Sequence, residues 1–240
     1  MLEKTTGIVL HSLKYSDTSI IVKIYTESFG LVSYLVRPSR NKKTGMKAGI
    51  FQPLAILDMI VMHKKKQGLQ TIKEITQCNQ FSQIPYDIKK SSIAVFIAEL
   101  LYKAIREEEQ NESLFHFLKS KIEFLDNTDG RTGEFHLSFL VELTLHLGFF
   151  PQLNYCENNI FNLYDGCFQE NIPEHSYYIS KELSGYFFYL VSASYADSQV
   201  QGIPGTARKE LLDKILDYYR IHLNGFQSLK SHIVLEEVFS

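Results

Sequence analysis

GIVLHSLKYSDTSIIVKIYTESFGLVSYLV, at Gly7–Val36, is a series of short β-rich runs separated by turn-forming residues. The runs Gly7–Tyr15, Ser19–Tyr25 and Leu31–Val36 are rich in β-branched and aromatic residues, which predicts three strands. Gly30 suits a tight hairpin before the third run, because glycine accepts a positive φ without penalty. The chain therefore opens with three antiparallel strands joined by short turns.

Two further strands are predicted downstream. Gly49–His63 reads GIFQPLAILDMIVMH, with Pro53 at a bend or bulge near its start. Leu69–Thr76 reads LQTIKEIT and alternates apolar and polar residues. Five short strands of this kind are typical of a partly open, five-stranded Greek-key barrel of the OB type. An SH3-like barrel has the same periodicity and stays open as the structural alternative.

The rest of the chain has a helical pattern that begins after Pro85. Asp87 is the expected N-cap of the first helix, and Thr206 that of the fifth. The predicted helices span Asp87–Glu109, Ser113–Leu125, Arg131–Leu147, Ser180–Ala193, Thr206–Leu223 and Leu229–Phe239. The expected fold class is therefore α+β multidomain: an OB-type barrel over residues 1–80 and an all-helical domain over residues 81–240. An irregular insertion at about residues 150–177 interrupts the helices.

Charge is distributed unevenly between the two parts. Residues 1–80 carry twelve Lys and Arg against five Asp and Glu, a net charge of +7. The remainder has a net charge of −9, which gives the overall −2. Such a field attracts a polyanion to the N-terminal part and repels it from the C-terminal part.

The cations gather in two connections of the predicted barrel. The connection Arg37–Lys47 has five cations and no acid, and Lys64–Lys66 forms the tip between the fourth and fifth strands. OB-folds bind single strands through a cationic groove and aromatic faces on which bases stack. The expected phosphate contacts are Arg37, Arg40, Lys42, Lys43 and Lys47, with Lys64, Lys65 and Lys66 secondary.

Several aromatic residues are candidates for stacking on bases. Tyr15, Tyr34 and Phe51 are the main candidates, with Tyr25 and Phe29 nearby. Each of these rings can equally be part of the barrel core, so the pattern leaves both roles open.

Motifs of catalysis and of membrane insertion do not occur in the sequence. It contains no phosphate-binding G-x-x-x-x-G-K-[ST] loop, no G-x-G-x-x-G turn and no H-E-x-x-H pair. Its eight histidines are scattered, and no nucleophile pairs recognisably with a base. Its first fifteen residues do not have the basic start and long apolar stretch expected of a signal peptide, and no apolar run of about eighteen residues occurs. Three cysteines fit reduced thiols in a cytoplasm. We expect a binding protein without enzymatic activity, cofactor or membrane contact.

The sequence resembles the RecO family of bacterial recombination mediators and strand-annealing proteins. Seven patches, in order, carry this resemblance along nearly the whole chain. They are GIVLHSLKYSDTS (Gly7–Ser19), IYTESFGLVSYLVR (Ile24–Arg37), the cationic connection Arg37–Lys47, GIFQPLAIL (Gly49–Leu57), GLQTIKEI (Gly68–Ile75), LTLHLGFFPQLNYC (Leu143–Cys156) and RKELLDKILDYYRIHLNGFQSLKS (Arg208–Ser231).

The resemblance implies a function in DNA repair in the bacterial cytoplasm, at the nucleoid. It implies binding of single-stranded and double-stranded DNA, annealing of complementary strands, and loading of RecA, together with RecR, onto DNA coated by single-strand-binding protein. It also implies a contact between the helical part and the acidic tail of that coating protein. An RNA-binding OB protein with a helical adaptor, or a structural adaptor that binds protein alone, are the alternative functions.

The insertion departs from the family pattern at its metal site. Many relatives have two C-x-x-C pairs that bind zinc, whereas here Asn159 stands three residues after Cys156 and Cys167 has no partner. His175 adds at most a third ligand, and structural zinc requires four N or S ligands. We therefore expect a degenerate zinc-finger-like insertion without metal. Its packing is expected to rest on Phe161, Tyr164, Phe168 and Tyr177.

Overall fold

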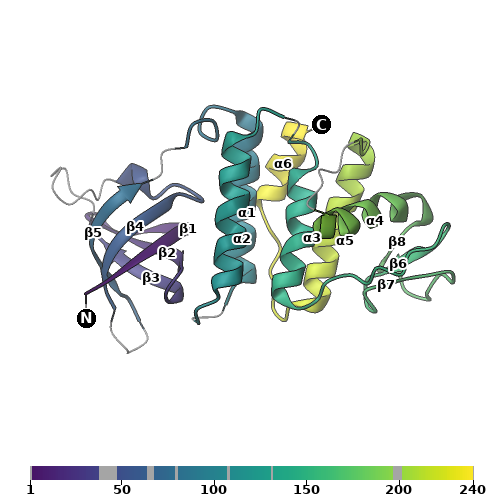
Figure 1. Cartoon of the computed structure of the whole chain (residues 1–240), viewed down its shortest axis with the longest axis horizontal. Helices are drawn as coiled ribbons and strands as arrows, with labels where there is room; N and C mark the ends of the chain where they lie inside the picture. The colour runs from purple at the N-terminus through teal and green to yellow at the C-terminus, as the bar shows by residue number, and fades with distance from the viewer. Residues whose placement is uncertain are drawn as a thin grey trace. The chain divides into compact units, whose positions relative to one another are not determined.

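A computed structural model of the chain describes residues 2–37, 48–63, 68–78, 81–106, 109–130, 132–196 and 202–239 (Figure 1). Contacts divide the chain into two compact units. Unit 1 comprises Met1–Thr128 and Leu229–Leu235, and unit 2 comprises Asp129–Ser228 and Glu236–Ser240. Whether residues 1–80 and 81–240 fold as separate domains stays a prediction. Within the described ranges, no helix combines the length and the apolar character that a membrane crossing requires.

Unit 1 begins with a curled antiparallel sheet (Figure 1). Its strands are β1 (Leu2–Ser16), β2 (Ser19–Thr26), β3 (Gly30–Val36), β4 (Ile56–Met62) and β5 (Thr71–Cys78), in the spatial order β3-β2-β1-β4-β5. A parallel bridge between Tyr34 and Gln70 brings β3 next to the start of β5. Closure of the third strand on the fifth is the OB arrangement, which confirms the predicted fold class.

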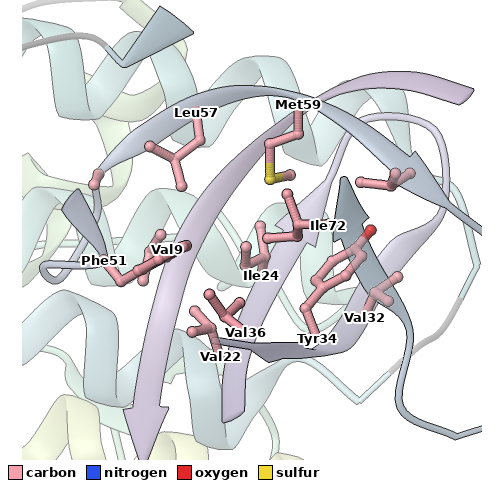
Figure 2. Packing of buried hydrophobic residues seen from close by; sticks show 12 residues of the cluster. Val9, Val22, Ile24, Val32, Tyr34, Val36, Phe51, Leu57, Met59 and Ile72 are labelled. Carbon is pink, nitrogen blue, oxygen red and sulfur yellow. The ribbon is translucent and has the colours of Figure 1, made fainter. Parts of the chain in front are cut away.

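The barrel interior is filled by alternate side chains of all five strands (Figure 2). Val22 and Ile24 of β2 and Tyr34 of β3 point inward, where they meet Leu57 and Met59 of β4. Since neighbouring residues of a strand point to opposite faces, this alternation leaves the odd-numbered residues of β2 and β3 on the outside.

The long strand predicted at Gly49–His63 is wrong in its first half. A short 3-10 helix, Ala48–Ile50, comes first, and β4 begins at Ile56. Pro53 has no amide hydrogen for a ladder, and Leu54 has a left-handed φ of 63°. The backbone of Leu54 and Ala55 instead bonds to Val9 of β1, at 2.8 and 2.9 Å. The segment therefore folds onto the end of the barrel.

Helices α1 (Ile88–Ala104) and α2 (Glu112–Asn127) belong to the same unit as the barrel. The predicted N-cap is confirmed, because the Asp87 side chain accepts hydrogen bonds from the amides of Lys89 and Lys90. Asn111 caps α2 in the same way. The first helix ends at Ala104, earlier than predicted, since the backbone of Ile105 is extended.

A buried polar network joins the segment before α1 to the end of α2. The carboxylate of Asp126 accepts hydrogen bonds from the amides of Ser82, Gln83 and Ile84 at 2.7–2.9 Å. The buried ammonium of Lys90 donates to Gln83 Oε1 and to the carbonyl oxygens of Asp126 and Thr128. Buried charges need such partners, so this network fixes how the two helices meet.

Unit 2 contains the helices α3 (Phe135–Leu147), α4 (Lys181–Ala196) and α5 (Gly205–His222). The last helix, α6 (Ser231–Phe239), is divided between the two units. The helical character of this region is confirmed. Thr206 is not the cap of α5, however, because the helix begins one residue earlier and the N-cap residue is Pro204.

The insertion, predicted as irregular, contains a small antiparallel sheet (Figure 1). Its strands β6 (Ile160–Asn162), β7 (Cys167–Gln169) and β8 (Tyr178–Ile179) lie in the order β7-β6-β8. Phe161 packs against Phe168 and Phe187 with ring centroids 4.9 and 4.6 Å apart. The predicted packing roles of Phe161 and Phe168 are thus confirmed, while Tyr164 and Tyr177 contact each other at the surface.

Candidate nucleic-acid interface

The outer face of β1, β2 and β3 carries two rows of residues at matching register. Strand pairing aligns His11 with Lys23 and Ser33 in one row, and Leu13 with Ile21 and Leu35 in the next. These six residues are called the outer face below. Their neighbours Val22 and Tyr34 fill the barrel core, so the rows themselves point away from it.

Tyr102 of helix α1 packs against the first row of the outer face, in which His11 stays exposed. The Tyr102 ring stacks on His11 at a centroid distance of 4.5 Å and an interplanar angle of 18°. The Lys23 ammonium lies 5.5 Å from the centroid of the same ring, a cation–π geometry. Tyr102 therefore contacts two residues of the first row, and the row of Leu13, Ile21 and Leu35 lies beyond these two.

The second row is accessible and adjoins the first turn of the barrel. Leu13 is 58% exposed, and Tyr15 two residues later is 62% exposed. Ile21 and Leu35 are half-buried. An exposed tyrosine next to aliphatic side chains offers flat, apolar surface on which a base can stack.

Cations border this surface on the side of β3. Arg37 follows β3 directly and is exposed. The bridge between Tyr34 and Gln70 is parallel, and Arg37 and the exposed Lys73 each stand three residues beyond it. Lys14 is also exposed, but Asp17 lies 3.4 Å from its ammonium. Arg37 and Lys73 therefore add positive charge at the seam between β3 and β5.

Most of the predicted phosphate contacts lie outside the described residues: Arg40, Lys42, Lys43, Lys47, Lys64, Lys65 and Lys66. Their roles stay predictions. The residues that flank them are described. Arg37 stands three residues after Tyr34, and Gly68 two residues before Gln70, so both of these flanking residues lie close in sequence to the bridge between β3 and β5. His63, at the end of β4, stacks on Phe29 with ring centroids 4.2 Å apart.

Two of the predicted stacking residues belong to the core. Tyr34 is fully buried and Phe51 is 3% exposed, so neither ring can present a face to a base. Burial also raises the pKa of the Tyr34 hydroxyl. Tyr25 is buried as well and packs against Phe115 of α2. Of the three main candidates, the structure places Tyr15 alone at the surface.

The sequence reasoning missed the aliphatic row of Leu13, Ile21 and Leu35. Strand pairing identifies this row. No single strand shows it, because the three residues become neighbours only in the register of β1, β2 and β3. Sequence alternation alone did not reveal this row because β1 is exposed on both faces near its end.

The predicted degenerate metal site has two cysteine thiols in different surroundings. Cys156 is exposed, whereas Cys167 is half-buried and its pKa is raised by burial and by Asp165. In the part of the chain that the structure describes, no three His, Cys, Asp or Glu side chains gather as metal ligands. The zinc-finger-like character is not confirmed, and the expected lack of metal stays a prediction.

The five-stranded OB barrel and the helical region that follows it define the fold class of the chain. Comparison with protein families assigns the chain within this class. The family model described as "Recombination protein O N terminal" matches residues 1–81, and "Recombination protein O C terminal" matches residues 85–232. The chain belongs to the RecO family.

Curated relatives match over the full length. The DNA repair protein RecO of Bacteroides fragilis is 42% identical over 241 residues, with 100% of both chains covered. The protein of the same name from Phocaeicola vulgatus is 39% identical over 241 residues at the same coverage. That from Flavobacterium psychrophilum is 39% identical over 239 residues, covering 99% of each chain.

Proposed function

We propose that this chain acts in DNA repair as a recombination mediator that binds single-stranded and double-stranded DNA and anneals complementary strands. The observation that carries the proposal is the full-length match to relatives named DNA repair proteins. The positive charge of Arg37 and Lys73 at the seam between β3 and β5 also supports the proposal. Annealing needs no nucleotide hydrolysis, so the proposed function requires no catalytic site.

The physical basis of annealing is charge neutralisation. Two strands repel each other through their phosphates when they approach. A barrel surface with Arg37 and the cations of the two adjoining segments lowers this repulsion and releases counterions, so binding weakens steeply as salt rises. Phosphate contacts carry little sequence information, and we expect slight sequence preference.

The acidic remainder of the chain has a different role in this proposal. Its net charge of −9 repels DNA and leaves its surfaces to protein partners. We propose that these partners are RecR and the tail of single-strand-binding protein, and that the assembly loads RecA onto the coated strand. The activity takes place in the bacterial cytoplasm, at the nucleoid.

A fluorescence annealing assay tests the proposal. Complementary labelled oligonucleotides are mixed with the full-length protein, with and without single-strand-binding protein. We expect annealing to accelerate in both mixtures without added nucleotide. Failure to bind DNA at low salt would instead favour a structural adaptor. If an RNA oligonucleotide competes much better than DNA of the same sequence, the protein is an RNA-binding OB protein.

A further inference from the structure

A cavity in unit 2 is not used by the proposed function. It has a volume of about 480 Å³ and lies between the segment that precedes β8 and helix α5. Ile172, Glu174 and Tyr178 line it from the insertion, and Glu210 and Lys214 line it from α5. Ile172 is 62% exposed and both glutamates are exposed, so the cavity is open to solvent. Its volume is within the range of ligand-binding pockets.

The lysine of this cavity already has partners within the protein. The Lys214 ammonium donates a hydrogen bond to the carbonyl oxygen of Ser176 at 3.3 Å, and it lies 5.8 Å from the centroid of the Tyr178 ring. These contacts join α5 to the insertion across the cavity. They also satisfy part of the charge of Lys214, so an anionic ligand would have to compete with them.

The two carboxylates of the cavity have no such partners. In the part of the chain that the structure describes, neither Glu174 nor Glu210 forms an ion pair or a side-chain hydrogen bond. The surroundings add negative charge, because unit 2 has six Lys and Arg against fourteen Asp and Glu, a net charge of −8. Such a field repels nucleic acids and acidic peptides and attracts cations. The cavity therefore indicates a positively charged ligand.

An arginine side chain fits this chemistry best. Among the described residues, no three His, Cys, Asp or Glu side chains gather as metal ligands, so the cavity lacks a ligand set for a metal ion. A guanidinium group presents five donors in a planar fork that matches carboxylate oxygens. Ile172 and Pro173 add apolar surface beside the carboxylates. A free polyamine has no apolar side chain for this surface, whereas a peptide can place one next to its arginine.

We propose that this cavity, called the acidic pocket below, binds an arginine-bearing peptide segment of a protein partner. Glu174 and Glu210 receive the guanidinium group, and Ile172 and Pro173 contact a neighbouring apolar side chain of the peptide. This goes beyond the proposed function, because it adds a partner segment of positive charge and assigns it to unit 2. The acidic pocket shares no residue with the candidate nucleic-acid interface, so DNA and this partner contact different residues.

A peptide titration of the full-length protein tests the proposal. The probe is a fluorescein-labelled peptide, Gly-Ser-Ile-Arg-Leu-Arg-Ser-Gly, and its anisotropy is measured without DNA at low ionic strength. Two comparison peptides replace both arginines by citrulline, which has the same shape without the charge, or by glutamate. We expect the citrulline peptide to bind about tenfold more weakly than the arginine peptide, because the charge-assisted hydrogen bonds are lost. The glutamate peptide should bind more weakly still.

Variants of the acidic pocket locate the binding. Glu174→Gln and Glu210→Gln should each weaken binding of the arginine peptide by about threefold, as expected for solvent-exposed ion pairs. Ile172→Ser should weaken the arginine and citrulline peptides alike, because it removes an apolar contact and no charge.

Glu157→Gln is the matched control, because Glu157 is an exposed glutamate of the same insertion that does not line the acidic pocket. It should bind the arginine peptide as the wild-type protein does, and thermal unfolding verifies that all variants fold. Equal effects of Glu157→Gln and the two pocket variants would overturn the proposal, since the peptide would then respond to net charge alone.

Three other results would also overturn the proposal. The arginine peptide does not bind, or the glutamate peptide binds more tightly than it does, or spermidine displaces it as well as the unlabelled peptide does. The second result would assign the pocket to an anion at Lys214, and the third to a free polycation. None of these results concerns DNA, so the annealing assay tests the proposed function separately.

Discussion

Tyr34 of β3 and Gln70, directly before β5, form a parallel bridge between segments that are far apart in sequence. The Gln70 amide donates to the carbonyl oxygen of Ser33 at 2.8 Å, and the Leu35 amide donates to that of Gln70 at 3.0 Å. This bridge closes the barrel, and Arg37 and Lys73 each stand three residues beyond it. The bridge also orients Tyr34 into the core and Leu35 outward, so the same pairing determines which side chains can contact a ligand.

Substitution of Gly30 tests how the β2–β3 turn packs. Gly30 has a φ of 63°, and a Cβ atom there would lie 2.3 Å from the carbonyl oxygen of Glu109. We expect Gly30→Ala to lower the free energy of unfolding by about 2–4 kcal/mol, because left-handed strain and overpacking add. Gly49→Ala is the control, since nothing lies within 4 Å of the added atom. Equal stability of the two variants in urea would show that the turn does not pack as described.

Glu99 of α1 should make stability depend on acid pH. Its carboxylate accepts hydrogen bonds from the amides of Lys230 and Ser231, at 3.0 and 2.8 Å, and pairs with Lys103 at 2.7 Å. Burial by itself would raise the pKa of Glu99, but the hydrogen bonds from Lys103, Ser231 and Lys230 outweigh it and lower the pKa to about 2.

A lowered pKa means that the ionised carboxylate stabilises the fold above the unfolded-state pKa, near 4.5, and that this contribution is lost as the pH falls toward 2. After allowance for solvent screening, we expect Glu99→Gln to cost about 1 kcal/mol at pH 7 and little near pH 2. Urea unfolding at several pH values measures this. Glu123→Gln, at an exposed position of α2, is the control. A pH-independent cost of Glu99→Gln would contradict the assignment.

Loss of the Asp126 carboxylate should destabilise unit 1. Its oxygens satisfy three backbone amides at residues 82–84 and the hydroxyl of Ser82. Asp126→Ala leaves these donors unpaired, and we expect a loss of about 2–4 kcal/mol in the free energy of unfolding. Asp126→Asn, which keeps one acceptor oxygen, should lose less. Asp17→Ala removes a fully exposed side chain and should change stability by less than about 0.5 kcal/mol. Equal effects of Asp126→Ala and Asp17→Ala would refute this role.

The insertion should depend on aromatic packing rather than on metal. Phe161 contacts Phe168 and Phe187, and its ring centroid lies 5.7 Å from that of Tyr218. Phe161→Ala should cost about 3–5 kcal/mol, since it leaves a cavity among these rings. The control Tyr189→Ala alters an exposed aromatic residue of α4. A chelator should leave the thermal unfolding of the wild-type protein unchanged, and one bound zinc per chain in metal analysis would contradict this account.

The sequence predicted the elements of the fold better than their boundaries. The β-rich runs identified all five strands, and Asp87 identified the start of α1, because these signals are local. The first half of the strand predicted at Gly49–His63 was wrong because the backbone of Leu54 and Ala55 bonds to Val9, far away in sequence. The sheet in the insertion was missed because its strands have two or three residues each, too few to show a period.

For the candidate site as well, the local sequence predicted some features, and the tertiary structure determines the others. Exposure of Arg37 and Tyr15 follows from their positions at the ends of strands. The sequence predicted Arg37 as a phosphate contact and Tyr15 as a candidate for stacking or for the core, and the structure excludes only the core role of Tyr15. Burial of Tyr34 and Phe51 depends on which face of the barrel each one occupies, and an aromatic side chain alone does not determine this. The row of Leu13, Ile21 and Leu35 depends on strand register, which is a tertiary property.

The salt dependence of single-strand binding tests most directly whether cations of the barrel neutralise phosphates. We expect the logarithm of the association constant to fall linearly with the logarithm of the salt concentration for the wild-type protein. The double variant Lys42→Ala, Lys43→Ala should have a slope shallower by about 0.7 for each lost contact. Lys181→Ala, Lys230→Ala, which removes two exposed lysines outside residues 1–80, should keep the wild-type slope. An unchanged slope and affinity in the Lys42, Lys43 variant would contradict the account and place the DNA elsewhere on the molecule.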